Sequence, residues 1–187
     1  MNKSTFLLIF LTLLLVGIVS SSDYGYNIYD NGDTYYYGGL WNWSENATTW
    51  TFPIDSSSVY YNMTGLNSVN LKGFTWHHNT TGTGGDYLKA KQNGIYKVDL
   101  AFSSASNGQG LFGFAVVKNF NVANNRRCYS RKFIQNANQP GSIAITCFMN
   151  LLKGETVNIQ LENELATTDL KIHAVNMNIF YIGKYNE

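Results

Sequence analysis

Charge is scarce in this chain of 187 residues: only 13% of them are Asp, Glu, Lys or Arg, and the formal net charge is +1. A near-neutral chain lacks the positive potential that nucleic-acid binding requires. A disordered chain is disfavoured for a different reason, because 44% of the residues are hydrophobic and 15% are aromatic. Solubility must therefore rest on uncharged polar residues, mainly Asn, Ser, Thr and Gly, as in many exported β-proteins.

The residues of most catalytic and metal centres are also few. Of three histidines, His77 and His78 are adjacent, so that on a strand they point to opposite faces, and His173 is distant in sequence. No H-E-x-x-H or Cys/His spacing supplies the ligands of a zinc site, and no G-x-S-x-G or phosphate-binding motif is present. Glu162 and Glu164 have the spacing of two carboxylates on one strand face, as a glycosidase needs, but solvated surface acids are the favoured interpretation. The sequence thus predicts a protein that is not an enzyme and that has no cofactor or metal.

Cysteine is limited to Cys128 and Cys147. An even pair in an exported chain suggests a disulfide, and two buried free thiols are the alternative. If the two strands pair through a turn at residues 138–140, the cysteines lie directly opposite each other. If the strands belong to different sheets, the cysteines lie about 10 Å apart. The sequence leaves this choice open.

The long apolar run at the amino terminus predicts a secretory signal peptide over residues 1–22. Lys3 supplies the positive charge, residues 6–19 the apolar segment and Ser20-Ser21-Ser22 the small residues near the cleavage site. The run is shorter than the roughly 20 apolar residues that span a bilayer, so an uncleaved anchor is disfavoured. Export also fits the N-x-[ST] sequons, although a chain rich in Asn, Ser and Thr forms such sequons by chance. The predicted glycosylation sites are Asn42, Asn46, Asn62 and Asn79.

Residues 23–66 differ in composition from the rest of the chain. They are dense in Tyr, Trp and Gly, and they contain acidic residues but no Lys or Arg. Aromatic side chains of this kind can stack on sugar rings. The favoured interpretation is an extended arm whose rings pack against the main domain or a neighbouring subunit. No Gly-X-Y repeat is present, which excludes a collagen stalk.

From residue 67 onward, short apolar runs alternate with polar residues and are separated by turns rich in Asn and Gly. In the run 94–102, alternate residues from Tyr96 to Phe102 share one face, which is the pattern of a half-buried strand. Further strands are expected near residues 69–77, 87–91, 111–119, 126–134, 142–152, 154–161 and 170–183. This number of short strands, with no helical periodicity, predicts one all-β domain over residues 67–187, a sandwich or barrel.

The order of these expected strands and turns resembles that of the complement C1q and tumour necrosis factor (C1q/TNF-like) superfamily. The matching pieces are G-I-Y-K-V (94–98), F-A-V-V-K-N (114–119), S-I-A-I-T-C-F-M-N-L (142–151), L-x-x-G-E-x-V (151–157) and I-F-Y-I-G (179–183). The resemblance covers about residues 85–184. It implies a ten-stranded jelly-roll β-sandwich of two five-stranded sheets in Greek-key order, assembled as a homotrimer. The sequence departs from the family at Glu155, where Asp is more usual, and it shows no clear set of calcium-binding acids.

The last expected strand carries apolar residues on both faces. Val175, Met177 and Ile179 share one face, and Phe180 and Ile182 share the other. A strand of this kind needs cover on both faces, so Phe180 and Ile182 are the predicted trimer interface. Cover by the aromatic arm within a monomer is the alternative.

Basic residues gather in a stretch that has no acid between Asp99 and Glu155. They are possible contacts of an anionic ligand or of the acidic arm, and a solvated edge strand protected against aggregation is the favoured alternative. These residues are Lys118, Arg126, Arg127, Arg131 and Lys132.

The features together predict a secreted, non-enzymatic recognition module that binds an extracellular protein or glycan as a homotrimer. No nucleic acid is expected as a partner, and no membrane span is expected after removal of the leader. The alternative function is a structural surface or coat protein of a virion or cell, with subunits linked through the aromatic arm.

Overall fold

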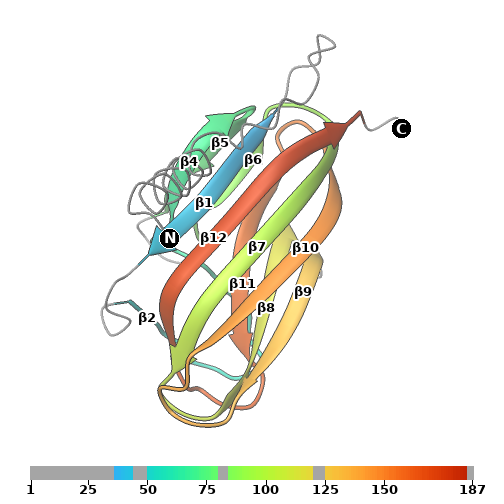
Figure 1. Cartoon of the computed structure of the whole chain (residues 1–187). Coiled ribbons are helices and arrows are strands. Elements are labelled where there is room, and N and C mark those ends of the chain that lie inside the picture. Colours follow the sequence, from blue (N-terminus) through green and yellow to red (C-terminus); the bar gives the residue numbers. More distant parts are fainter. Residues whose placement is uncertain (1–35, 44–49, 80–83, 120–124, 185–187) are drawn as a thin grey trace, which may run out of the picture. The chain divides into compact units, whose positions relative to one another are not determined.

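The computed structural model describes residues 36–43, 50–79, 84–119 and 125–184. Within these ranges every regular element is a β-strand, and the strands form two antiparallel sheets packed face to face (Figure 1). The predicted all-β sandwich is confirmed. The described residues contain no helix that could cross a membrane. The predicted signal peptide, residues 1–22, lies outside them.

The first sheet, sheet A, has the strand order β10-β7-β12-β1-β4, and the second, sheet B, has the order β5-β6-β11-β8-β9. Sheet A contains β1 (Tyr37–Trp43), β4 (Asn67–Lys72), β7 (Gly94–Ser106), β10 (Gly141–Leu151) and β12 (Leu170–Gly183), and β2 (Thr51–Phe52) pairs with β12. Sheet B contains β5 (Phe74–His77), β6 (Tyr87–Ala90), β8 (Gly110–Lys118), β9 (Arg126–Ile134) and β11 (Thr156–Asn163), and β3 (Tyr61–Asn62) pairs with β11. The ten longer strands therefore form two five-stranded paths, and the two-residue strands β2 and β3 add to the ten that were expected.

The core between the sheets is built by the alternating apolar residues of the long strands. On β7 the inward side chains of Tyr96, Val98 and Leu100 are at most 1% exposed. The rings of Phe102 on β7 and Phe114 on β8 meet across the two sheets with their centres 4.7 Å apart. The face predicted for the run 94–102 is confirmed by this burial. Burying such residues is the main favourable term in folding.

Part of the aromatic-rich segment 23–66 forms strands of the sandwich. β1 lies between β12 and β4, with Leu40 fully buried and opposite Met177. The same segment adds the core residues Phe52, Ile54, Met63 and Leu66. These described residues are therefore part of the sandwich itself and do not form the extended arm that was expected. β1 is hard to recognise from the sequence because Gly38 and Gly39 stand within it, where a strand pattern has larger residues. The packing requires glycine at position 39, since a Cβ there would lie only 2.9 Å from the Met177 carbonyl oxygen.

The single strand expected over residues 69–77 is two strands in different sheets. β4 ends at Lys72 in sheet A, and β5 begins at Phe74 in sheet B. Gly73 between them has φ of +84°, a conformation that glycine adopts without steric cost. The chain turns there from one sheet to the other.

The disulfide between Cys128 and Cys147 is present, but it does not join a hairpin. β9 belongs to sheet B and β10 to sheet A, so the connection through residues 135–140 passes from one sheet to the other. Both are edge strands on the same side of the sandwich (Figure 1). The Cα atoms are 5.8 Å apart, because the two sheets converge at this edge to the usual disulfide distance. The bridge therefore closes the open edge of the sandwich.

Candidate functional site

Aromatic side chains form a row across the outer face of sheet A. The strand register places Tyr37 opposite Phe180, Phe180 opposite Lys97, and Lys97 opposite Phe148. The three aromatic side chains are 40%, 44% and 63% exposed in the order Tyr37, Phe180, Phe148. Ile182, two residues beyond Phe180, is 53% exposed. We call these five residues the aromatic row. It contains Phe180 and Ile182, the two residues predicted for a subunit interface.

An ion pair lies at the centre of this face. Lys97 Nζ is 2.8 Å from Asp99 Oδ2, and Thr146 Oγ1 donates a hydrogen bond of 2.7 Å to Asp99 Oδ1. Partial burial alone would raise the pKa of Asp99, but the hydrogen bonds from Lys97 and Thr146 outweigh it and lower the pKa. The carboxylate is therefore ionised at neutral pH and compensates the charge of Lys97.

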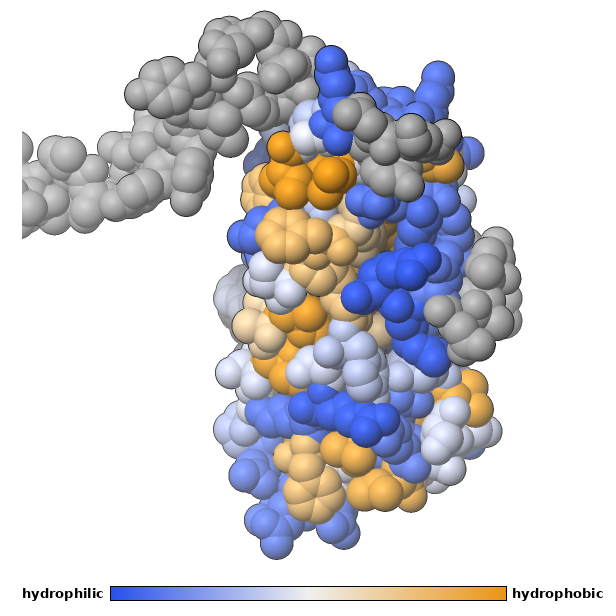
Figure 2. All heavy atoms as spheres, turned by 90° about the vertical axis from the view of Figure 1, so that its right-hand side faces the viewer, coloured by the Kyte–Doolittle hydropathy of each residue, from blue (hydrophilic) through white to orange (hydrophobic). Residues whose placement is uncertain are grey.

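The open edge formed by β9 and β10 also carries apolar groups. Figure 2 shows this side of the molecule, where apolar residues gather in a column between hydrophilic residues. Phe133 on β9 is 50% exposed, and Ile143 and Ile145 on β10 are partly exposed although they pack against the core. Phe148 at the end of the aromatic row also lies on β10, so this edge and the row are continuous.

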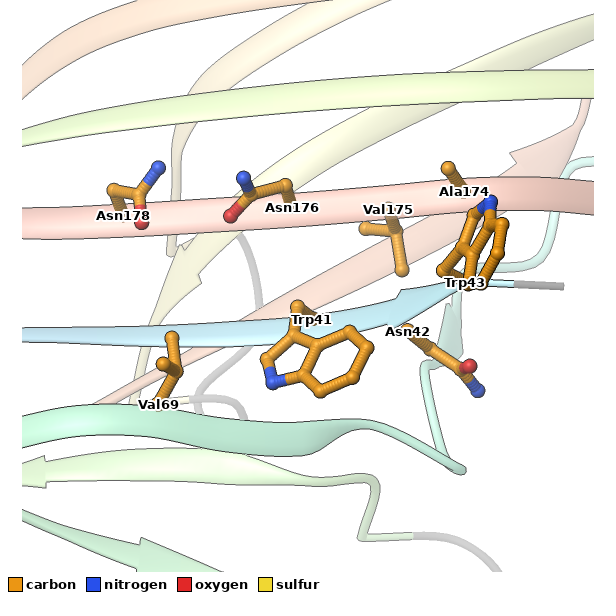
Figure 3. A pocket seen from close by; sticks show the side chains of 8 residues that line it. All are labelled: Trp41, Asn42, Trp43, Val69, Ala174, Val175, Asn176 and Asn178. Atoms are coloured by element: carbon orange, nitrogen blue, oxygen red, sulfur yellow. The ribbon is translucent and has the colours of Figure 1, made fainter. Parts of the chain in front are cut away.

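A groove lies at the other end of the outer face of sheet A. Trp41 and Trp43 on β1 are 38% and 60% exposed, and β12 supplies Asn176 opposite Trp41 and Ala174 opposite Trp43. The groove has a volume of about 330 Å³ (Figure 3). We call it the Trp groove; its eight lining residues are Trp41, Asn42, Trp43, Val69, Ala174, Val175, Asn176 and Asn178.

The two carboxylates with strand spacing, Glu162 and Glu164, meet on the outer face of sheet B. The Tyr129 hydroxyl lies 2.5 Å from Glu164 Oε1 and 3.2 Å from Glu162 Oε1, and Arg131 Nε lies 2.6 Å from Glu164 Oε1. Glu162 is only 5% exposed, which differs from the expected solvated acid. Burial and a hydrogen bond to Glu162 raise the pKa of Tyr60 far above its ordinary value, so that this hydroxyl remains a donor. The network holds both carboxylates by hydroxyl and guanidinium groups.

In the predicted basic cluster, Arg131 pairs with Glu164, and Lys118 also has a carboxylate partner. Its Nζ lies 2.6 Å from Glu155 Oε2, and both side chains are largely buried. Burial alone would raise the pKa of Glu155, but hydrogen bonds from the Leu152 N–H, Lys118 and the Asn119 amide outweigh it and lower the pKa. Glu155 thus binds the turn before β11 to the end of β8.

The other four basic residues lie along β9 and have different environments. The guanidinium group of Arg126 lies 3.9 Å from the centre of the Tyr60 ring, and that of Arg131 lies 5.2 Å from the centre of the Tyr129 ring. Lys132 donates a hydrogen bond of 3.3 Å to a backbone carbonyl of β10. Arg127 is exposed and has no ion pair with a described residue. Among the described residues, this cluster contacts the segment 23–66 through the Tyr60 ring and not through Asp55, the acid of that segment that the structure describes.

The three histidines do not converge. His77 stacks on Tyr87 with ring centres 4.6 Å apart, and His78 Nδ1 lies 2.9 Å from the buried carboxylate of Asp86. His173 lies on β12 in sheet A. Within the described ranges no three His, Cys, Asp or Glu side chains are grouped so that they could hold a metal ion.

The predicted glycosylation sites differ in their surroundings. The Asn42 amide on β1 donates a hydrogen bond of 2.6 Å to a backbone carbonyl. Asn62 Oδ1 accepts hydrogen bonds from two buried amides of β11, each 2.8 Å long. Asn79 follows β5 and is partly exposed. Asn46 lies outside the described residues.

Comparison with known proteins identifies the fold. No protein-family model matches the chain, and none of the curated proteins matches it. Among solved structures, the Eiger TNF from S. frugiperda has 10% sequence identity and a TM-score of 0.54, with 82% of this chain and 97% of that chain covered. Murine APRIL has 12% identity and a TM-score of 0.49, with 80% of this chain and 100% of that chain covered. The chain has the C1q/TNF-like jelly-roll fold, as the resemblance implied.

Proposed function

We propose that this protein is an extracellular, non-enzymatic recognition module that works as a homotrimer and binds a protein or a glycan. The aromatic row is the observation that carries the proposal. It leaves four large apolar side chains 40–63% exposed on one face of a sheet. Each Å² of apolar surface removed from water contributes about 25 cal/mol, and monomeric proteins rarely expose large contiguous apolar patches. A second copy of the chain is the partner that we propose for this row.

The arrangement of apolar surfaces supports a closed ring of subunits. A ring with head-to-tail contacts needs two different surfaces on each chain that fit each other. The aromatic row supplies one surface, and the edge of β9 and β10, with Phe133, supplies the other. We propose that the edge of one subunit packs on the aromatic row of the next, with three subunits closing the ring as the fold resemblance implies.

An extracellular location is supported by the disulfide, because such bridges persist in oxidising compartments. The predicted signal peptide and the N-linked sites Asn42, Asn46, Asn62 and Asn79 belong to the same proposal. A trimer presents three copies of each binding surface, which raises avidity without new contacts. The absence of enzymatic activity is supported by Glu162 and Glu164, whose carboxylates are engaged by tyrosine and arginine side chains.

The proposal is tested by size-exclusion chromatography with light scattering on residues 23–187 at micromolar concentration. We expect three times the subunit mass for the native sequence. The double variant Phe180→Lys/Ile182→Lys places charge in the aromatic row and should be monomeric. Leu165→Lys is the matched control, because Leu165 is 61% exposed in the loop after β11 and should leave the trimer intact. A monomeric native protein, or a double variant that stays trimeric, would contradict the proposal.

A further inference from the structure

We propose that three lysines at one end of the sandwich form a binding site for a sulfated polysaccharide. This inference rests on the proposed recognition function and names the class of its ligand. Lys89, Lys91 and Lys153 lie at the end where β12 finishes and β7 begins, the upper end in Figure 1. We call these three residues the lysine patch. It is separate from the basic cluster predicted from the sequence, whose residues lie on β8 and β9.

Hydrogen bonds hold together the two turns that carry the patch. Lys91 stands in the turn after β6, and Lys153 stands in the turn before β11. The Lys153 N–H donates to Asn93 Oδ1 over 2.7 Å, and the Gly154 N–H donates to the Ala90 carbonyl oxygen over 2.7 Å. The two turns therefore form one surface, and the lysines extend from a backbone that is fixed by these bonds.

The side chain of Lys89 brings a third charge to the same surface. Its Cε lies 3.9 Å from the position that a Cβ on Gly154 would occupy, so the side chain extends along the turn that contains Lys153. On β6 the neighbours Leu88 and Ala90 are buried in the core, which directs Lys89 to the outer face of sheet B. All three lysines are exposed, so their ammonium groups face solvent around one turn.

The charges of the patch are not compensated by carboxylates of the described chain. None of the three lysines takes part in the ion pairs that form among the described residues. Glu155 is the acid of these turns, but its oxygens already accept from Lys118, the Asn119 amide and the Leu152 N–H. Neighbouring like charges without partners create a positive potential, which attracts an anionic ligand to this end of the molecule.

The composition of the patch favours a ligand that carries many fixed charges. Arginine binds carboxylate and phosphate groups in a bidentate manner, whereas lysine acts as a point charge on a flexible stem. Lysines without arginine therefore suit a chain of sulfate groups, which needs positive charge at several points and no single oriented contact.

Other polyanions fit the site less well. Single-stranded nucleic acids stack their bases on aromatic rings, and none of the exposed aromatic residues of the described chain stands in these two turns. Anionic lipids are concentrated in the cytoplasmic leaflet of a membrane, which an extracellular protein does not meet. A sulfated polysaccharide is the extracellular polyanion that these observations favour.

The lysine patch lies outside the proposed subunit contact, which uses the outer face of sheet A and the edge of β9 and β10. In sheet B the strands β11 and β8 separate β6 from β9, a distance of about 14 Å, so Lys89 and Lys91 lie far from that edge. Lys153 lies beyond the end of β10, in the turn that leads to β11. Lys72 and Lys184 are left out of the patch because they stand beside the aromatic row.

A homotrimer would present three lysine patches. In a ring with threefold symmetry, equivalent residues lie at the same level along the axis, so the three patches share one side of the assembly. A polysaccharide long enough to reach two patches gains avidity without any new contact.

The test uses isothermal titration calorimetry of untagged residues 23–187 with a heparin octasaccharide. We expect binding whose affinity falls about tenfold or more between about 50 and 200 mM salt, as ionic contacts to a polyanion require. The triple variant Lys89→Gln/Lys91→Gln/Lys153→Gln should weaken the affinity tenfold or more. The triple variant with Arg at the same three positions keeps the charges and should bind about as well as the native protein. Unchanged circular-dichroism spectra show that the variants are folded.

Lys171→Gln is the matched control for Lys89→Gln, because each removes one positive charge. Lys171 lies near the start of β12, at the opposite end of the sandwich, where it donates to Asn138 Oδ1. Lys89→Gln should weaken the affinity severalfold, and Lys171→Gln should leave it unchanged.

The proposal is overturned if the octasaccharide does not bind at 50 mM salt, or if its binding survives the triple Gln variant. Equal binding of a desulfated heparin octasaccharide, or tighter binding of duplex DNA or phosphatidylserine vesicles, overturns the ligand class. Light scattering on the same samples reports assembly separately. A trimer that does not bind heparin rejects only the lysine patch, and a monomer that binds it through these lysines rejects only the trimer.

Discussion

Replacing Leu40 by Ala tests whether β1 is an integral strand of the sandwich. The Leu40 side chain is 0% exposed and lies opposite Met177 on β12. Removal of three carbon atoms loses about 2.4 kcal/mol of transfer free energy, at about 0.8 kcal/mol per methylene. The remaining cavity adds to this loss, and measured Leu→Ala changes in a protein core range from about 2.7 to 5 kcal/mol. We expect the free energy of unfolding to fall by about 3 to 4 kcal/mol.

The measurement is equilibrium unfolding in urea at one fixed protein concentration, because subunit assembly makes apparent stability depend on concentration. Trp41→Ala is the control, since Trp41 is the next residue of the same strand and is 38% exposed. Its loss should stay below about 1 kcal/mol, as at most surface sites. A loss for Leu40→Ala that matches the loss for Trp41→Ala would refute the packing of β1 in the core.

Three further changes address other contacts. Replacing Cys128 and Cys147 by Ala should lower the free energy of unfolding by about 3 kcal/mol, the loop-entropy value for a sequence separation of 19, and a reductant should destabilise only the native protein. Glu155→Gln should lose about 1 to 2 kcal/mol at pH 7. Because the pKa of Glu155 is lowered by folding, this stability is lost as the pH falls below the ordinary value of about 4.3, and a deficit unchanged between pH 7 and pH 3 would contradict the ion pair. Gly39→Ala should destabilise by about 1 to 3 kcal/mol because its Cβ meets a carbonyl oxygen of β12 at 2.9 Å, whereas Gly183→Ala, with nothing within 4 Å of its Cβ, should not.

The long strands could be predicted from sequence because half-buried strands alternate strictly. The run 94–102 fixes the inward face of β7, and the burial of Tyr96 and Val98 follows from it. β1 could not be recognised in this way. Its large residues, Tyr37, Trp41 and Trp43, are 40%, 38% and 60% exposed on the outer face, while its glycines occupy buried positions. A hydrophobicity pattern assumes the opposite arrangement, with bulky residues inside.

The candidate site depends on contacts between distant parts of the chain. Phe180 and Ile182 could be predicted as outward residues because the last strand is apolar on both faces. The Trp groove could not, since it requires the register that pairs Trp43 with Ala174. The burial of Glu162 likewise depends on Tyr60 and Tyr129, which reach it from other segments. Periodicity within one strand carries no information about such neighbours.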